Sequence, residues 1–191
     1  SDIPPSTPAT TTSFLFRADG SASWKVGSAH LLASVSGPME VSKRDEEPTT
    51  AALEVVLRPD VGLSSPREQY LQDRIRKALT PVIILDLNPR TLIQLVIQIV
   101  ESGDLQTHNR IALAAAINAA YLALLDAGIP MRSTLKGGAV ERLLMSENSG
   151  MFSTERLFEC YEIAAKVCVE TNGVMREVVA KGVERLDTWR K

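Results

Sequence analysis

The chain has 191 residues, of which 45% are hydrophobic and 23% charged, with a formal net charge of -2 and a pI of about 5.8. This length and balance predict one globular domain that buries its core without disulfides or metals. The charge argues against a nucleic-acid binder that depends on bulk positive charge, although a local basic strip is still possible. No apolar run reaches the ~20 residues that a membrane-spanning helix needs, so we expect no membrane partner.

The first part of the chain reads as a leader followed by a meander of strands. Residues 1–12 are rich in Pro, Ser and Thr, which predicts a disordered leader and gives no sign of a signal peptide. Extended segments then follow at hairpin spacing, the first starting at Phe14 and the next two covering residues 21–26 and 30–36. Gly37-Pro38 is expected to end the third of these strands.

The middle of the chain alternates between strand and helix patterns. Residues 52–57 predict a strand, and residues 91–100, which are rich in branched side chains, predict the clearest strand of the sequence. Between them, residues 67–79 predict a helix, because apolar side chains recur there on one face and basic side chains on another.

The segment from Asn109 to Asp126 predicts a helix without a polar face. It reads NRIALAAAINAAYLALLD and has no charge between Arg110 and Asp126. A helix that is apolar all round is buried on all sides, and its small alanine side chains let neighbouring backbones come close. We therefore expect a central helix that packs against a sheet and ends near Gly128.

The last part of the chain predicts two short strands and one long helix. Residues 131–135 and 141–145 read as short extended pieces, and Ser153 is a good N-cap for the helix that follows. Cys160 and Cys168 are expected to be buried thiols. They form no CxxC pair and have no histidine nearby in the sequence, so the pattern of a metal site is missing. The order of elements predicts an α+β domain in which mixed sheets pack with the buried central helix and the long C-terminal helix.

A family resemblance is carried by four stretches that occur in this order: FRADGSASWKVGSAHLLASVSGPMEV, LEVVLRPDVGLSS, LNPRTLIQLVIQIVESG and INAAYLALLDAGIPM. In combination they resemble the RNase PH family over most of the chain from Phe14 onward. The resemblance implies the ribosomal protein S5 domain 2-like fold for residues 13–191 as a single domain. It also implies a subunit that pairs with other RNase PH-like chains in a six-membered ring around an RNA channel.

The same resemblance points to the start of the apolar helix. Active family members carry a motif similar to Gly-Gly-Thr-Arg at this position. The motif forms a phosphate site in which backbone N–H groups, the helix N-terminus and charged side-chain donors hold the anion. The aligned positions in this chain are Arg110, Ile111, Ala112 and Leu113, so the glycine pair and the hydroxyl are missing and Leu113 stands where the arginine would be. Loss of one such donor costs about 10²–10³ in rate. The site is therefore predicted to be degenerate.

One alternative is left open at this position. In a shifted register Arg110 would bind phosphate, because an arginine at a helix N-terminus opposes the helix dipole and is stabilised by a nearby anion. The other interpretation is a solvated arginine that bonds a neighbouring carboxylate such as Asp104.

The second half of the family's site is a pair of acidic residues thought to hold a metal. The resemblance implies a further segment with two strands at Val140-Glu141, where this chain runs directly from KGGAV into ERLLM. We therefore expect a gap or a deletion at 140/141, and we assign no catalytic residue, no metal ligand and no cofactor.

A second candidate site is the basic face of the predicted helix over residues 67–79. Part of this helix resembles a run whose arginine contacts substrate in active relatives, which favours contact with RNA phosphates in the ring channel. A solvated helix face is the alternative, because Glu68 and Asp73 lie in the same segment. The predicted RNA contacts are Arg74, Arg76, Lys77 and Arg110.

With the degenerate phosphate site, the resemblance implies a non-catalytic structural subunit of the RNA exosome core ring, lining the channel for 3'-to-5' RNA degradation and processing. Its expected partners are other RNase PH-like exosome subunits in a hetero-hexameric ring, cap proteins and single-stranded RNA. The expected location is the nucleus and nucleolus, and also the cytoplasm. The alternative is an enzyme, either an active phosphorolytic exoribonuclease or a homodimeric metal-dependent nuclease.

Overall fold

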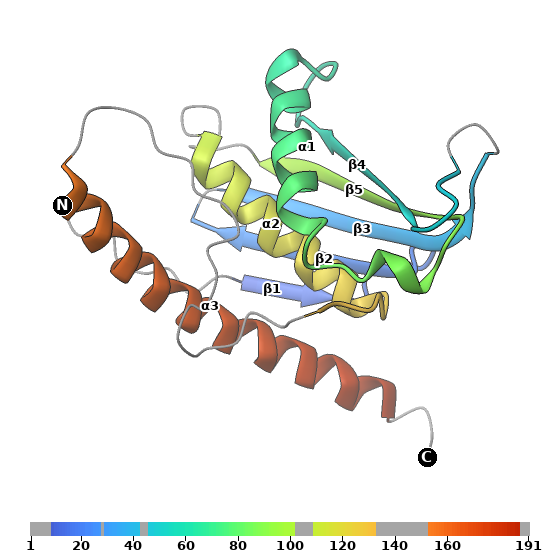
Figure 1. The fold of residues 1–191 in the computed structure, drawn as a ribbon. Coiled ribbons are helices and arrows are strands. Elements are labelled where there is room, and N and C mark those ends of the chain that lie inside the picture. The colour runs from blue at the N-terminus through green and yellow to red at the C-terminus, as the bar shows by residue number, and fades with distance from the viewer. Residues whose placement is uncertain (1–8, 28, 43–45, 102–108, 133–152, 188–191) are drawn as a thin grey trace.

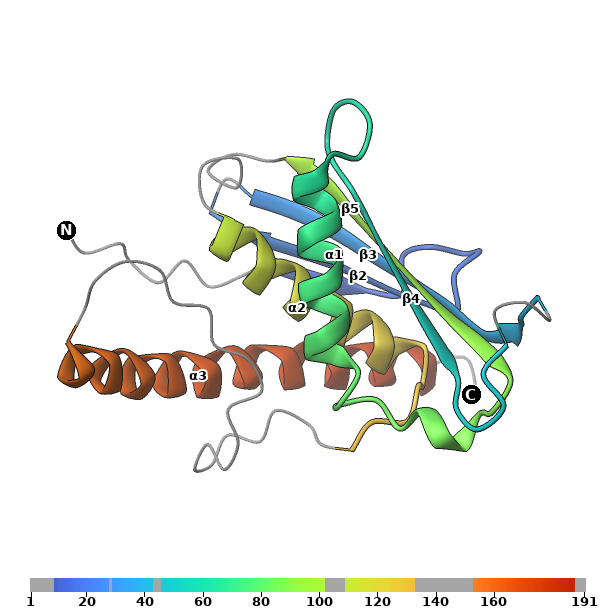
Figure 2. The same ribbon diagram turned by 45° about the horizontal axis from the view of Figure 1, so that its top comes forward.

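A computed structural model describes residues 9–27, 29–42, 46–101, 109–132 and 153–187. Within these ranges the chain forms a five-stranded sheet and three α-helices (Figure 1). Helices α1 and α2 cover one face of the sheet, and the long helix α3 runs beside α2 and the edge strand β1 (Figure 2). The α+β architecture predicted from the sequence is confirmed.

The sheet has the order β1-β2-β3-β5-β4. All neighbouring strands are antiparallel except β4 and β5, which are parallel. Along the central strands β3 and β5, buried residues alternate with half-buried ones, and the buried set faces the helices. The strands are β1 (Ala9–Thr12), β2 (Gly20–Val26), β3 (Ala29–Glu40), β4 (Ala52–Arg58) and β5 (Thr91–Glu101).

The predicted meander is present, but two of its boundaries were wrong. The first strand is β1, which falls inside the expected leader 1–12, whereas the extended segment was expected to start at Phe14. Pairing of β1 with β2 orders these Thr-rich residues, and local composition does not report such pairing. Residues 1–8 lie outside the described residues.

The second correction concerns Gly37-Pro38, which does not end β3. The strand continues to Glu40 through a register shift between Ser36 and Met39, so a bulge absorbs the dipeptide. Gly37 is required there, because its φ is +134° and a Cβ would lie 2.5 Å from the Leu92 carbonyl oxygen. The Asp19 carboxylate accepts the Gly37 backbone N–H at 2.7 Å and fixes the bulge to the β1–β2 turn.

Helix α1 (Pro66–Leu79) begins with a capping box. The Ser65 hydroxyl accepts the Arg67 backbone N–H at 3.3 Å, and the Glu68 carboxylate accepts the Ser65 backbone N–H at 2.8 Å. The helix buries Leu71 and Ile75 against the sheet and α2, and it agrees with the prediction for residues 67–79. A short 3₁₀ turn, η1 (Leu85–Leu87), leads from α1 to β5.

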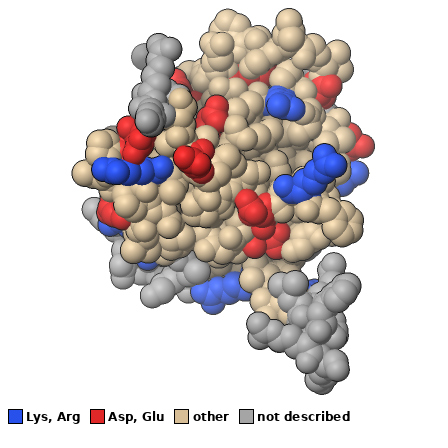
Figure 3. Space-filling view, turned by 90° about the vertical axis from the view of Figure 1, so that its right-hand side faces the viewer, with Lys and Arg blue, Asp and Glu red and all other residues tan. Residues whose placement is uncertain are grey.

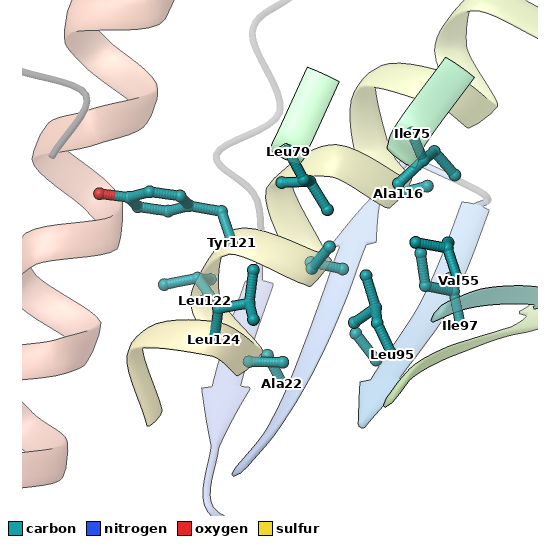
Figure 4. Packing of buried hydrophobic residues seen from close by; sticks show 14 of the residues in the cluster. Ala22, Val55, Ile75, Leu79, Leu95, Ile97, Ala116, Tyr121, Leu122 and Leu124 are labelled. Carbon is teal, nitrogen blue, oxygen red and sulfur yellow. The ribbon is translucent and has the colours of Figure 1, made fainter. Parts of the chain in front are cut away.

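Helix α2 (Asn109–Asp126) is the central helix that the sequence predicted. It lies on β2 and β3 and contacts both other helices, and Figure 4 shows Leu122 and Leu124 directed into the core while Tyr121 points to α3. The approach to β2 is so close that a Cβ on Gly20 would lie 2.3 Å from the Ala123 carbonyl oxygen. Gly128, with φ of +69°, ends the helix.

Helix α3 (Thr154–Asp187) starts as predicted after Ser153, whose hydroxyl accepts the Arg156 backbone N–H at 3.4 Å. Its burial differs from the prediction, because Cys160 and Cys168 are exposed rather than buried. The apolar side chains of α3 extend around more of the helix circumference than the strip of residues that contacts β1 and α2, so some of them are exposed. Near the middle of the helix that strip does bury Met175.

The predicted short strands receive little support from the described residues. Met131 makes one isolated bridge with Ile83, and the rest of the expected strand 131–135 lies mainly outside them. The expected strand 141–145 and the junction at 140/141 also lie outside the described residues. Within the parts of the chain that the structure describes, no helix has the length and apolarity to cross a membrane.

Candidate functional site

The predicted phosphate position lies where the first turns of α1 and α2 meet the ends of β4 and β5. A cavity of about 200 Å³ opens there. Its apolar wall is formed by Leu71, Ile99 and Ala112, one each from α1, β5 and α2. The start of the central helix is therefore beside a pocket, as a phosphate site would require, and the chemistry of its lining decides what it can hold.

The side chains that the structure describes at the start of α2, from residue 112 onward, give this pocket no anion donor. Ala112 and Leu113 are only 4% and 5% exposed, and both belong to the hydrophobic core. Aliphatic groups cannot replace the hydroxyl and guanidinium donors that hold a phosphate. The side chains of Arg110 and Ile111, and all of Asp104, lie outside the described residues, so both interpretations of Arg110 stay predictions.

The polar lining of the pocket carries more negative than positive charge. Asp60 and Glu68 contribute two carboxylates, and Arg67 contributes one guanidinium. Burial by itself raises the pKa of Glu68, but the hydrogen bonds from the Ser65 hydroxyl and backbone N–H, helped by the Arg67 charge, bring this pKa below its ordinary value. Glu68 is therefore ionised at neutral pH. A carboxylate already occupies the N-terminus of α1, where an anion would otherwise be stabilised.

The basic residues predicted to contact RNA divide between two sides of α1. At about 100° per residue, Arg74 and Lys77 share a flank with Arg67, whereas Arg76 lies on the opposite flank. Arg76 forms an exposed ion pair with Asp73 at 3.5 Å. The structure thus brings Arg74 and Lys77 together and separates Arg76 from them.

Sequence reasoning missed an aromatic residue on the basic flank. The Arg74 guanidinium lies 5.0 Å from the centroid of the Tyr70 ring, a cation–π contact. Tyr70 is 40% exposed, so one face of this flank combines positive charge with an accessible ring. The i, i+3 and i+7 spacing of Arg67, Tyr70 and Arg74 is the signal that would have found it.

The described residues contain no further catalytic constellation. No group of three or more His, Cys, Asp or Glu side chains in them is arranged to hold a metal ion. The acidic pair of the family, which the resemblance implies near 140/141, falls outside these residues.

Comparison with known proteins identifies the fold. Residues 9–130 match the RNase PH family model, described as the 3' exoribonuclease family, domain 1. The exosome complex component RRP46 of Saccharomyces cerevisiae is 30% identical over 204 aligned residues, which cover 86% of this chain and 92% of that protein. The crystal structure of rice (Oryza sativa) Rrp46 matches with a TM-score of 0.76 and 26% identity, and the match covers 91% of this chain and 94% of the rice chain.

The lengths of these matches differ in an informative way. The exosome complex component rrp46 of Schizosaccharomyces pombe is 45% identical over 118 residues, which cover 62% of this chain and only 50% of that protein. The S. cerevisiae match covers 86% of the 191 residues of this chain, which is about 164 residues, but its alignment is 204 positions long. About 40 positions of the S. cerevisiae relative therefore have no counterpart in this chain.

The family model covers well over half of the chain, and the S. cerevisiae relative aligns along nearly its whole length. The fold agrees with the rice structure over 91% of this chain. The chain belongs to the RNase PH family of 3' exoribonucleases.

Proposed function

We propose that this chain is a non-catalytic structural subunit of an RNA exosome ring, in which it pairs with other RNase PH-like subunits and lines the channel for 3'-to-5' RNA degradation and processing. The observation that carries the proposal is the aliphatic start of α2, with Ala112 and Leu113 buried at the positions of the family's phosphate ligands. The relatives named as exosome components, among them the S. cerevisiae and S. pombe proteins, support the ring assignment.

The proposal that the chain is not an enzyme is argued from the charge and donors of the pocket. Phosphorolysis needs inorganic phosphate held by hydrogen-bond donors and positive charge. The described lining of this pocket has an apolar wall, two carboxylates and a single guanidinium. A phosphate dianion placed beside Glu68 and Asp60 would be repelled at short range, and no side chain at 112 or 113 would offset that repulsion.

RNA contact is proposed for the flank of α1 that carries Arg67, Tyr70, Arg74 and Lys77. Guanidinium and ammonium groups neutralise backbone phosphates, and an accessible aromatic ring offers a stacking surface for one unpaired base. Such a flank suits single-stranded RNA that slides past without sequence readout. Arg76 is left out of this surface, because it lies on the other flank beside Asp73.

The partners and the location are proposed on the family resemblance. We place the chain in a hetero-hexameric ring of RNase PH-like subunits with cap proteins, in the nucleus, nucleolus and cytoplasm. The names of the relatives as exosome complex components support assembly with other exosome subunits.

Two measurements test the proposal. The purified chain, given 3'-tailed RNA and inorganic phosphate, is expected to release no nucleoside diphosphate, and with Mg²⁺ or Mn²⁺ alone it is expected to release no nucleoside monophosphate. Native mass spectrometry of the complex carrying a tagged copy is expected to find RNase PH-like subunits in equimolar amounts. Release of diphosphate would instead favour the phosphorolytic enzyme, and metal-dependent monophosphate release by a homodimer would favour the nuclease.

A further inference from the structure

Strand β4 forms one open edge of the sheet. It pairs with β5 alone among the described strands, and it offers seven residues of backbone, Ala52–Arg58, on its other side. Unpaired N–H and C=O groups along such an edge are a template for another strand. Edges of this kind are normally blunted or covered, so what lies beside β4 decides whether the template is usable.

One contact shows which groups face outward. The Leu57 carbonyl oxygen accepts the side-chain amide of Gln72 on α1 at 3.2 Å, so it is directed away from β5. In a strand the N–H and C=O of one residue point to the same side, and the side alternates from residue to residue. Leu53 and Val55 therefore present their backbone groups to the same outer side as Leu57. Gln72 occupies the end of this row and leaves its beginning uncovered.

The beginning of the row is the wall of a groove of about 590 Å³. Four consecutive residues of β4, from Ala52 to Val55, line it. The opposite wall comes from α1, through Gln72, Asp73 and Arg76. The groove thus follows the accessible edge for about half of the strand, which is the shape that an added strand requires.

The charge of the groove restricts its occupant. Among the described residues, three carboxylates, Glu40, Glu54 and Asp73, line it with one guanidinium, Arg76, for a formal charge of -2. Asp73 and Arg76 are paired at 3.5 Å, so Glu40 and Glu54, both exposed, are the carboxylates of the groove without an ion pair to another described residue. Figure 3, viewed from the end of the sheet at which β4 begins, shows acidic and basic side chains interspersed over this side of the molecule. Within the groove, the exposed Glu40 and Glu54 carboxylates disfavour RNA phosphates and favour a basic polypeptide.

We propose that the β4 edge is a subunit-docking site, which an extended segment of a neighbouring RNase PH-like subunit occupies by adding a sixth strand beside Ala52–Val55 with a Lys or Arg opposite Glu54. The inference rests on the proposed ring assembly and specifies one of its interfaces. Backbone hydrogen bonds to Leu53 and Val55 supply the pairing, and the Glu40 and Glu54 carboxylates select a basic segment.

Hydrogen exchange on the intact complex tests the inference. A tagged copy is purified with its partners, and the amides of residues 52–58 are compared between the complex and the free chain. Added-strand pairing is expected to slow the outward amides of Leu53 and Val55 by about tenfold or more. If the complex forms and these amides exchange at the free-chain rate, strand addition is overturned while the ring proposal stands. If no complex forms, both are overturned, and slowed amides in a dimer of this chain alone would make a second copy the occupant.

Charge variants provide the second arm. Glu54→Lys is expected to weaken association with the partner subunits by about tenfold, since it places like charges together. Glu54→Gln, which can still accept the Gln94 amide hydrogen bond seen at 2.8 Å, is expected to have a smaller effect in the same direction. Glu101→Lys is the matched control, because it makes the same charge change at the other end of the sheet and also breaks one contact, to Lys25 at 3.4 Å. Equal weakening by Glu54→Lys and Glu101→Lys would contradict the proposed site.

Discussion

Helices α2 and α3 both carry long apolar stretches, but they meet different surroundings. On α2, Ala120 and Leu124 are fully buried between the sheet and the neighbouring helices. On the first half of α3, Phe158, Ile163 and Val167 are 62%, 61% and 52% exposed. An apolar sequence therefore predicts burial only where the fold supplies a second surface to cover it.

The contact strip of α3 explains why its apolar residues are left uncovered. Asn172 and Met175 are buried in the strip, and Tyr161 is half-buried near its beginning. Ile163 and Val167 lie well away from that strip around the helix, at about 100° per residue.

The largest expected effect separates the two helices directly. Leu124→Ala removes a fully buried side chain from α2 and should lower the free energy of unfolding by about 2–5 kcal/mol. Ile163→Ala on α3 removes a similar volume from an exposed position and should change it by no more than about 0.5 kcal/mol. Urea denaturation of the purified chain measures both. Similar losses from the two variants would mean that the first half of α3 is covered in solution.

Two glycines, one packed against α2 and one in α3, extend the comparison, because replacing them by alanine should change the free energy of unfolding in opposite directions. Gly20→Ala places a Cβ 2.3 Å from backbone atoms of α2, and the resulting overpacking should cost about 1–3 kcal/mol. At Gly173 in α3 a Cβ meets nothing within 4 Å. Gly173→Ala should therefore stabilise the chain by about 0.4–1 kcal/mol through helix propensity and a less flexible unfolded state. Thermal unfolding of the two variants tests the signs, and a destabilising Gly173→Ala would show an unseen neighbour at that position.

The N-termini of α1 and α3 provide a smaller contrast that depends on pH. The pKa of Glu68 is lower in the folded chain than in the unfolded chain, so the ionised Glu68 carboxylate stabilises the folded state. This stabilisation is fully present above the pKa of the unfolded chain and is lost as the pH falls through the pKa of the folded chain. The loss should be about 1 kcal/mol. Glu68→Gln should flatten this acid limb of a plot of unfolding free energy against pH. Glu155→Gln, in the first turn of α3 and outside any capping box, should leave the limb closer to wild type.

The parts of the fold that the sequence predicted are those with a strong local pattern. The unbroken apolar segment of α2 and the branched residues of β5 require burial wherever the chain places them. Strand β1 was missed, because its Thr-rich residues are ordered by pairing with β2. The passage of β3 through Gly37-Pro38 was missed because it depends on a bulge opposite Leu92. Pairing and bulges of this kind join residues that are distant in the sequence.

The candidate site divides in the same way. The aliphatic residues Ala112 and Leu113 were identified from the motif they replace, since substitution of donors is visible in the sequence. The negative charge of the pocket was not predicted, because it arises only when the first turn of α1 brings Glu68 beside Ala112. The division of the basic cluster between two flanks of α1 follows from helical spacing and was available from the sequence.

The smallest expected effect on stability is at the cysteines of α3, where the prediction of buried thiols was wrong. Cys160 and Cys168 are exposed, so Cys160→Ser and Cys168→Ser should each change the free energy of unfolding by no more than about 0.5 kcal/mol. Both thiols should react with a chromogenic disulfide reagent in native buffer, and each variant should lose one reactive thiol. Reaction that requires denaturant would show that a surface covers α3 in solution. Thiols that react in the free chain but slow upon assembly with the partner subunits would instead place a covering surface on a neighbouring subunit.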